Sequence, residues 1–217
     1  MIKNKEKFDL YYEFLVSENE KYNLTSITKY SEVYAKHFID SLAMEDVIDL
    51  NQELSICDVG SGAGFPGIPL KIEHNNINLT IIEPTTKRVQ FLYELTRKLE
   101  LSNVNLINDR AENATDYREK FDITCARAVA SMPILLELLV PITKVGGKII
   151  LYKGDKGLIE LDESKNALKE LKCTVEKVHE YDLPDDLGKR FLIVFKKDSK
   201  TNIKYPRRYS IIKHNPL

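Results

Sequence analysis

The stretch ICDVGSGAGFPGIPLKI, which runs from Ile56 to Ile72, decides the fold of this chain. An apolar run ends at Asp58, and an apolar pattern with helical spacing resumes after the glycines. Because glycine has no Cβ, such a turn can adopt positive φ and approach a ligand closely, and free N–H groups at a helix start favour polar or anionic ligand groups. The stretch therefore predicts a strand, a ligand-binding turn and a helix, with turn glycines at Gly60, Gly62, Gly64 and Gly67.

Two known motifs fit these glycines. Counted from Gly62, the residues match G-x-G-x-x-G, the dinucleotide fingerprint. Counted from Asp58, the run D-V-G-S-G-A-G resembles motif I of class I S-adenosylmethionine-dependent methyltransferases. We favour the second motif because the strand is predicted to end at Val59, which makes Gly60 the first residue of the turn. Glu83, at the end of the next predicted strand, is placed to reach a ribose in either case.

Strand-like and helix-like runs alternate after residue 51, which predicts a parallel sheet covered on both faces, with the ligand at the carboxyl ends of the strands. Two late strands around a Pro, Asp and Gly turn cluster indicate an antiparallel hairpin that closes the sheet. We therefore predict an α/β fold: a Rossmann-like, seven-stranded, mostly parallel sheet of class I methyltransferase type. A dehydrogenase of this size would usually need a further substrate region. The predicted strands are 54–59, 79–83, 104–108, 121–126, 147–153, 174–181 and 191–196, and the main helices are 86–99, 131–143 and 157–171.

The chain is expected to have three parts. Residues 1–50 form a helical N-terminal extension packed on the core, with a helix over Lys5 to Val16 and a second helix capped by Ser31. Residues 51–197 form the cofactor-binding domain, and residues 198–217 form a basic C-terminal tail.

Composition limits the class of protein. The formal net charge of -1 gives no global basic field that would indicate a nucleic-acid partner, so local charge has to be considered. Cys57, Cys125 and Cys173 are widely spaced in apolar runs, which predicts buried free thiols in a reducing compartment. No secretory signal or membrane-length apolar run is apparent, and no His, Cys and carboxylate cluster has metal-ligand spacing. We expect a cytoplasmic monomer that needs no metal ion.

The type of methyl transfer can be narrowed by the residues present. No N/D-P-P-Y/F motif for exocyclic amines follows the fourth strand, which continues as CARAVASMP. Cytosine C5 methylation needs a thiolate nucleophile, and Cys125 is better interpreted as a core cysteine. A ring nitrogen with a free lone pair, such as guanine N7, needs only alignment and exclusion of water. This reasoning alone leaves the target atom open.

Eight motifs are spread along most of the chain: Asn23-Leu24-Thr25, His37-Phe38-Ile39-Asp40-Ser41, DVGSGAGFPGIPL, Lys87-Arg88, Asp109-Arg110-Ala111-Glu112, Ala126-Arg127-Ala128, Lys153-Gly154 and Tyr205-Pro206-Arg207. Together they closely resemble the bacterial RsmG family, formerly GidB, and the GFPGIPL extension of motif I is the most specific of them. The resemblance covers roughly residues 20 to 210 and implies a guanine-N7 methyltransferase of 16S ribosomal RNA near the decoding centre, with S-adenosylmethionine as cofactor and 16S rRNA or the small ribosomal subunit as partner. Pro84, after Glu83, departs from the family pattern and removes a backbone donor.

The resemblance also implies site residues. Catalytic roles are expected for His37, Arg127 and Lys153. Cofactor binding is expected for Asp58, Gly60, Gly62, Gly64, Phe65, Glu83, Ala111, Glu112 and Arg127, and RNA binding for Asn23, Thr25, Lys153, Lys204, Arg207 and Arg208. From the residues alone, Arg127 could instead pair with a helix carboxylate, and Lys153 could be a solvated strand end.

The C-terminal tail has a local excess of positive charge. It has one acid, Asp198, and two tyrosines, Tyr205 and Tyr209, that could stack on unpaired bases while the cations attract phosphate. The alternative is a merely solubilising end. At the level of the whole chain, a non-catalytic RNA-binding or ribosome assembly factor and an RNA methyltransferase of different target atom stay open. The basic residues are Lys196, Lys197, Lys200, Lys204, Arg207, Arg208 and Lys213.

Overall fold

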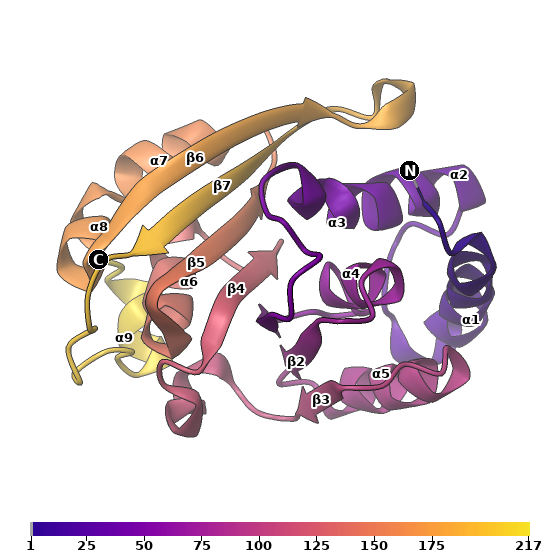
Figure 1. The fold of residues 1–217 in the computed structure, drawn as a ribbon, viewed down its shortest axis with the longest axis horizontal. Helices are drawn as coiled ribbons and strands as arrows, with labels where there is room; N and C mark the ends of the chain where they lie inside the picture. Colours follow the sequence, from indigo (N-terminus) through magenta and orange to yellow (C-terminus); the bar gives the residue numbers. More distant parts are fainter. Residues whose placement is uncertain (1) are drawn as a thin grey trace.

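A single seven-stranded sheet forms the centre of the molecule, with strand order β3-β2-β1-β4-β5-β7-β6 (Figure 1). The computed structural model describes residues 2–217. The first five strands are parallel, and β7 runs antiparallel to both β5 and β6, so the predicted sheet with its closing hairpin is confirmed. The strands are β1 (Ser55–Val59), β2 (Asn78–Ile82), β3 (Val104–Ile107), β4 (Phe121–Arg127), β5 (Thr143–Lys153), β6 (Cys173–Asp182) and β7 (Lys189–Lys197).

Helices cover both faces of the sheet. Neighbouring strand residues point to opposite faces, so Ile56 joins one apolar cluster with α1, α4 and α5, while Cys57 joins a second cluster with α6, α8 and α9. The α-helices of the core and the C-terminus are α4 (Gly67–Glu73), α5 (Thr86–Lys98), α6 (Met132–Leu139), α7 (Gly157–Glu163), α8 (Lys165–Leu171) and α9 (Tyr209–His214). Short 3-10 turns are η3 (Ala111–Asn113), η4 (Thr115–Tyr117), η5 (Val140–Ile142) and η6 (Pro184–Asp186).

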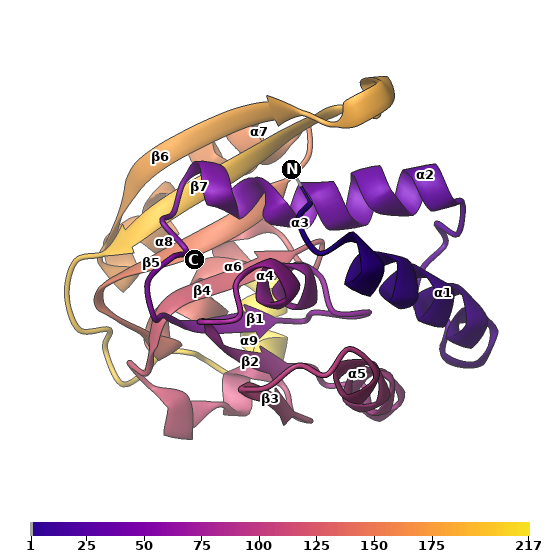
Figure 2. The same cartoon turned by 45° about the vertical axis from the view of Figure 1, so that its right-hand side comes forward.

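The N-terminal helices pack directly on the sheet cluster. The helical segments between Tyr30 and Asp46 join end to end into one rod, the N-terminal helical rod, which lies between α1 and the β6–β7 hairpin (Figure 2). Tyr11 and Phe38 are buried against Phe65 of the glycine stretch, and Tyr181 on β6 donates to Asp40 at 2.8 Å. The N-terminal elements are α1 (Lys5–Tyr22), α2 (Tyr30–Val33), the π-helix η1 (Tyr34–Ile39), α3 (Asp40–Leu42) and the 3-10 turn η2 (Ala43–Asp46).

Several predicted boundaries are wrong, and local chemistry explains them. The first helix continues past Val16 to Tyr22 and ends where Asn23 adopts left-handed φ, a common helix stop. The second helix begins at Tyr30, one residue before the predicted cap, and the described residues give it no side-chain cap; Lys29 O accepts from Val33 N. Ser31 therefore does not cap this helix.

Three further boundaries differ in the C-terminal half. The predicted 157–171 helix is two helices that meet at Ser164, whose hydroxyl donates to Glu160 O. The predicted 131–143 helix stops at Leu139 and becomes a 3-10 turn around Pro141, which has no N–H for an α-helical bond. Strand β5 starts at Thr143, four residues early, because a bulge between the Phe121–Thr143 and Ile123–Lys148 pairs takes up the residues around Gly146.

The three cysteines are buried free thiols, as predicted. Among residues 2–217, no helix has the length and apolar character to cross a membrane. In the same range, no group of three or more His, Cys, Asp and Glu side chains is placed to hold a metal ion.

Candidate functional site

The glycine turn joins β1 to α4 at the carboxyl edge of the sheet. Gly60 has φ +72°, and its N–H donates to Ile82 O at 2.8 Å, which ties the turn to β2. A Cβ at Gly60 would lie 2.6 Å from Val129 Cγ2, whereas one at Gly62, with φ +60°, would enter open space. The backbone of the turn therefore lies open to a ligand at Gly62.

The buried Asp58 carboxylate holds the two ends of this turn together. It is fully buried, and its Oδ2 accepts from Ser61 Oγ at 2.6 Å and from Gly67 N at 2.8 Å, so one carboxylate closes the whole loop. Burial raises the pKa of Asp58 to about 6, although the bonds from Ser61 and Gly67 oppose the shift. The Asp58 side chain therefore lies inside the turn and does not line the cavity beside Glu83.

Glu83 lies on the ligand side of the turn. Its Oε2 accepts from Gly62 N and its Oε1 from Thr85 N, both at 3.0 Å, and the Arg88 guanidinium lies 3.7 Å away. Pro84 has no N–H to donate. The next residue, Thr85, donates its N–H to Glu83, so the carboxylate still has a backbone donor from this segment. The carboxylate is thereby fixed at the end of β2, where a ribose hydroxyl would be expected.

A cavity of about 240 Å³ opens beside Glu83, across the carboxyl ends of β1 to β4. It is lined by two carboxylates, Glu83 and Glu112, each with an arginine beside it, and otherwise by largely apolar residues. These walls fit an adenosine group, with its hydroxyls at a carboxylate and its flat base against aliphatic side chains. Sequence reasoning identified Gly60, Glu83, Ala111 and Glu112 but missed most of the walls. The lining residues are Val59, Gly60, Ile82, Glu83, Pro84, Arg88, Arg110, Ala111, Glu112, Ala128, Val129, Leu138 and Tyr209.

A second cavity, of about 540 Å³, adjoins the first, and Ala128 lines both. Ala128 follows β4 with φ +56°, a left-handed conformation that is uncommon for alanine. Most of the residues that line this cavity are charged or polar, and it brings together His37, Arg127 and Lys153, the three predicted catalytic residues. Its lining residues are Ile27, Lys36, His37, Asp40, Arg127, Ala128, Ala130, Tyr152, Lys153, Gly154, Asp155, Glu160 and Arg190.

Arg127 joins β4 to the N-terminal helical rod. Its NH1 donates to Asp40 Oδ2 at 2.7 Å, to Lys36 O at 3.2 Å and to His37 O at 3.3 Å. The two carbonyls lie within the π-helix, a helix form whose shifted bonding often marks functional sites. The ion pair with a helix carboxylate, which was the alternative interpretation of Arg127, is therefore present.

His37 is held as a neutral imidazole. Its Nε2 is 3.0 Å from Thr25 Oγ1, its Nδ1 is 3.2 Å from Lys36 O, and its ring stacks on Phe65 with centroids 4.6 Å apart. Burial, with a smaller contribution from the Arg127 charge, lowers the pKa of His37 to about 4. Thr25 thus reaches the cavity through His37, and Phe65 supports both His37 and Arg127, whose guanidinium lies 5.0 Å from its ring.

Lys153 is buried, so the interpretation as a solvated strand end is wrong. Its Nζ donates to Ala130 O at 2.9 Å and to Glu160 Oε2 at 2.8 Å, and the same Glu160 oxygen accepts from Met132 N. Lys153 therefore ties the end of β5 to the loop after β4, on the wall of the second cavity.

The tail is folded against the domain. Glu137, which is fully buried on α6, accepts from Arg207 Nε at 2.8 Å and from Arg207 NH2 at 2.6 Å. Tyr205 is also buried, with its hydroxyl donating to Glu170, so the expected stacking of Tyr205 on bases is wrong. Lys204 and Arg208 are exposed, as is Asn23 at the end of α1, and these three line neither site cavity.

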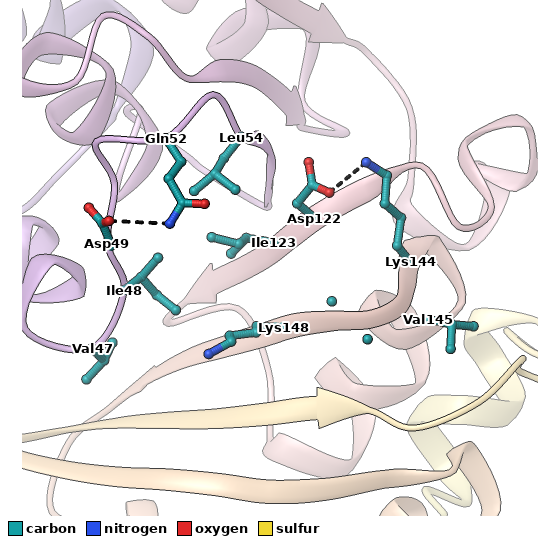
Figure 3. Close-up of a pocket in the computed structure, with 12 residues that line it drawn as sticks. Val47, Ile48, Asp49, Gln52, Leu54, Asp122, Ile123, Lys144, Val145 and Lys148 are labelled. Carbon is teal, nitrogen blue, oxygen red and sulfur yellow. Dashed lines mark hydrogen bonds and ion pairs between the residues drawn. The ribbon is translucent and has the colours of Figure 1, made fainter.

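A further cavity of about 540 Å³ lies at the opposite edge of the sheet, between residues 47–54 and the start of β5 (Figure 3). Gln52 bonds Asp49, and Lys144 pairs with Asp122 at 2.6 Å. The predicted site residues all fall within residues 2–217, and none of them lines this cavity. In open α/β sheets ligands bind at the carboxyl ends of the strands, so this cavity at the amino ends is not the candidate site.

Comparison with known proteins gives consistent results. A solved structure of M. jannaschii TYW2 in complex with AdoMet superposes with a TM-score of 0.58 at 17% identity, covering 74% of this chain and 76% of that chain, which supports the fold. Ribosomal RNA small subunit methyltransferase G of Staphylococcus carnosus is 48% identical over 99% of this chain and 91% of its own length, and that of Staphylococcus aureus strain Newman is 46% identical over 98% and 90%. The family model described as rRNA small subunit methyltransferase G matches residues 4–187. This chain therefore belongs to the rRNA small subunit methyltransferase G family.

Proposed function

We propose that this protein transfers a methyl group from S-adenosylmethionine to N7 of a guanine in 16S ribosomal RNA near the decoding centre. The observation that carries the proposal is the pair of adjoining cavities that share Ala128. One is suited to adenosine and the other to a polar base. Methyl transfer needs the donor and the acceptor atoms in contact, which is possible where the two cavities join.

The first cavity would hold the cofactor. Glu83 would accept from the ribose hydroxyls, Gly60 would let the backbone approach, and Ala111 with Glu112 would border the adenine. Gly62, whose N–H donates to Glu83, would hold that carboxylate in place. When bound, S-adenosylmethionine supplies an electrophilic methyl group on a sulfonium. Asp58, buried beneath the turn, would act by holding its shape.

Methyl transfer to guanine N7 needs no general acid or general base from the protein. Guanine N7 has a lone pair and no proton, so alignment and exclusion of water are sufficient. The neutral His37 fits a positioning role through Thr25 and Phe65. Burial raises the pKa of the Cys125 thiol well above its usual range, which argues against a thiolate nucleophile and hence against C5 chemistry.

The second cavity would hold the target guanine. Arg127 makes its short bonds through NH1, while its NH2 reaches only His37 Nδ1 at 3.5 Å, which leaves N–H donors for the O6 edge or a phosphate. Lys153, at the end of the neighbouring parallel strand β5, brings a second cation to this cavity, paired with Glu160. The exposed cations Lys204 and Arg208, and Asn23 at the end of α1, would contact flanking RNA.

The test is to incubate naked 16S rRNA and intact small subunits, both from cells lacking this activity, with methyl-labelled S-adenosylmethionine and to map the label. We expect one N7-methylguanosine, detected by chemical cleavage at that base. Label on a carbon or exocyclic amine would overturn the N7 assignment, and RNA binding without transfer would favour an assembly factor. Lys153→Met should reduce transfer, whereas Lys144→Met, a matched loss of charge at the opposite sheet edge, should not.

A further inference from the structure

The C-terminal helix α9 reaches the cofactor cavity. Tyr209, its first residue, lines the 240 Å³ cavity together with Pro84, Ala111 and Leu138, which come from three other parts of the chain. The side chain is half-buried, with Ser210 beside it exposed to solvent. A residue expected to stack on RNA thus lies on the wall of the site for the cofactor base.

The Tyr209 ring contacts the Arg110 guanidinium. The guanidinium carbon of Arg110 lies 4.5 Å from the ring centroid, within the range of a cation–π interaction. Arg110 Nε also donates to Glu112 Oε1 at 2.5 Å. The tyrosine, the arginine and the glutamate therefore form one connected edge of the cavity.

The segment before and after Tyr209 is anchored to the domain. Arg207, two residues earlier, forms the two-pronged pair with buried Glu137 on α6. Ile212, three residues later, is fully buried in the cluster under α6. Arg118 holds the incoming chain by donating to Tyr205 O and Thr201 O, both at 2.7 Å.

We propose that Tyr209 is an adenine-binding residue and that Arg207 is the positioning residue that holds it at the cavity. An aromatic ring on a preformed apolar wall suits a flat purine, because stacking adds to burial of the base. The C-terminal segment then completes the cofactor site instead of serving only as a basic tail. This inference rests on the proposed function, because it takes S-adenosylmethionine as the ligand.

Calorimetric titration of the full chain with S-adenosylmethionine tests the proposal. Tyr209→Leu should raise Kd about tenfold, Tyr209→Phe should stay within about twofold of wild type, and the exposed neighbour Ser210→Ala should not change it. A Tyr209→Leu variant with wild-type Kd would overturn the proposal. A wild-type protein that binds no S-adenosylmethionine would overturn the proposed function as well, so the two failures are distinct.

Fluorescence gives a second, independent readout because the chain contains no tryptophan. The indole of a Tyr209→Trp variant should change emission as S-adenosylmethionine is added, with a midpoint at the calorimetric Kd. A Tyr93→Trp variant, at an exposed position of α5, is the matched control, and its emission should stay constant. Unchanged emission from Tyr209→Trp during calorimetrically measured binding would overturn the proposal, as would a response only to single-stranded rRNA oligonucleotide.

The positioning role of Arg207 is tested in the same background. Adding Arg207→Gln to Tyr209→Trp should shift the emission of the free protein toward that of a solvent-exposed indole and shrink the response to S-adenosylmethionine. Lys213→Gln, an exposed charge loss on the same helix, should do neither. Arg207→Gln that leaves both the emission and the cofactor response unchanged would overturn this part of the proposal.

Discussion

The guanidinium of Arg127 at the end of β4 donates to the carboxylate of Asp40 at 2.7 Å, across 87 residues of sequence. Both side chains are mostly buried, with 12% and 6% of their surfaces exposed. Removing one partner of a buried pair leaves the other charge without compensation, which costs far more than loss of a surface pair. This contact therefore couples the N-terminal helical rod to the sheet edge that carries the site.

Asp40→Asn should lower the free energy of unfolding by about 2–4 kcal/mol. The amide keeps only one of the two oxygens that accept from Arg127 and Tyr181, and it cannot balance the charge of Arg127. Urea unfolding followed by circular dichroism measures the change. Glu32→Gln, which breaks the more exposed Lys36–Glu32 pair at 2.7 Å on the same rod, should cost less than about 1 kcal/mol. Equal losses in the two variants would contradict the argument.

His37 should make stability depend on pH below neutrality. Its pKa is about 4 in the folded protein and about 6.5 when unfolded, so the unfolded chain binds more protons between these values. The contribution of His37 to stability should therefore rise with pH across that window, being complete above about 6.5 and lost as pH falls toward 4. The difference in unfolding free energy between wild type and His37→Gln, measured by urea titrations from pH 4 to 7, should grow in favour of wild type as pH rises. A difference that does not change with pH would contradict this assignment.

The sequence was sufficient for the fold, since the predicted sheet with its closing hairpin is confirmed. Motif spacing also predicted Gly60, Glu83 and Ala111, which follow directly from where strands end, and the structure places all three on the wall of one cavity. Motif spacing could not predict that Asp58 faces the inside of the turn, since both roles need a carboxylate at the same position. The partners Asp40 for Arg127 and Glu160 for Lys153 depend on tertiary packing and leave no local pattern.

Asp58 should show the opposite pH dependence to His37. Burial raises its folded pKa to about 6, above the ordinary value of 3.8, so between those values the folded protein binds more protons than the unfolded chain. Its ionisation therefore reduces stability as pH rises from about 4 to 6. As pH rises over that range, the unfolding free energy of Asp58→Asn should therefore increase relative to that of wild type. Asparagine keeps an acceptor for Ser61 and Gly67, so a variant that unfolds at every pH would contradict this account.

Gly60→Ala should damage the proposed cofactor site more than the fold. The new Cβ would lie 2.6 Å from Val129 Cγ2 on a backbone with φ +72°, so the turn or the residues after β4 have to shift. The strain should cost about 1–3 kcal/mol of stability, and S-adenosylmethionine should bind at least about tenfold more weakly because both shifted segments line the cavity proposed to hold it. Gly154→Ala is the matched control, since its Cβ would meet nothing within 4 Å and it lines only the second cavity. Calorimetry that finds equal cofactor affinity in the two variants would show that the Gly60 turn does not shape the cofactor site.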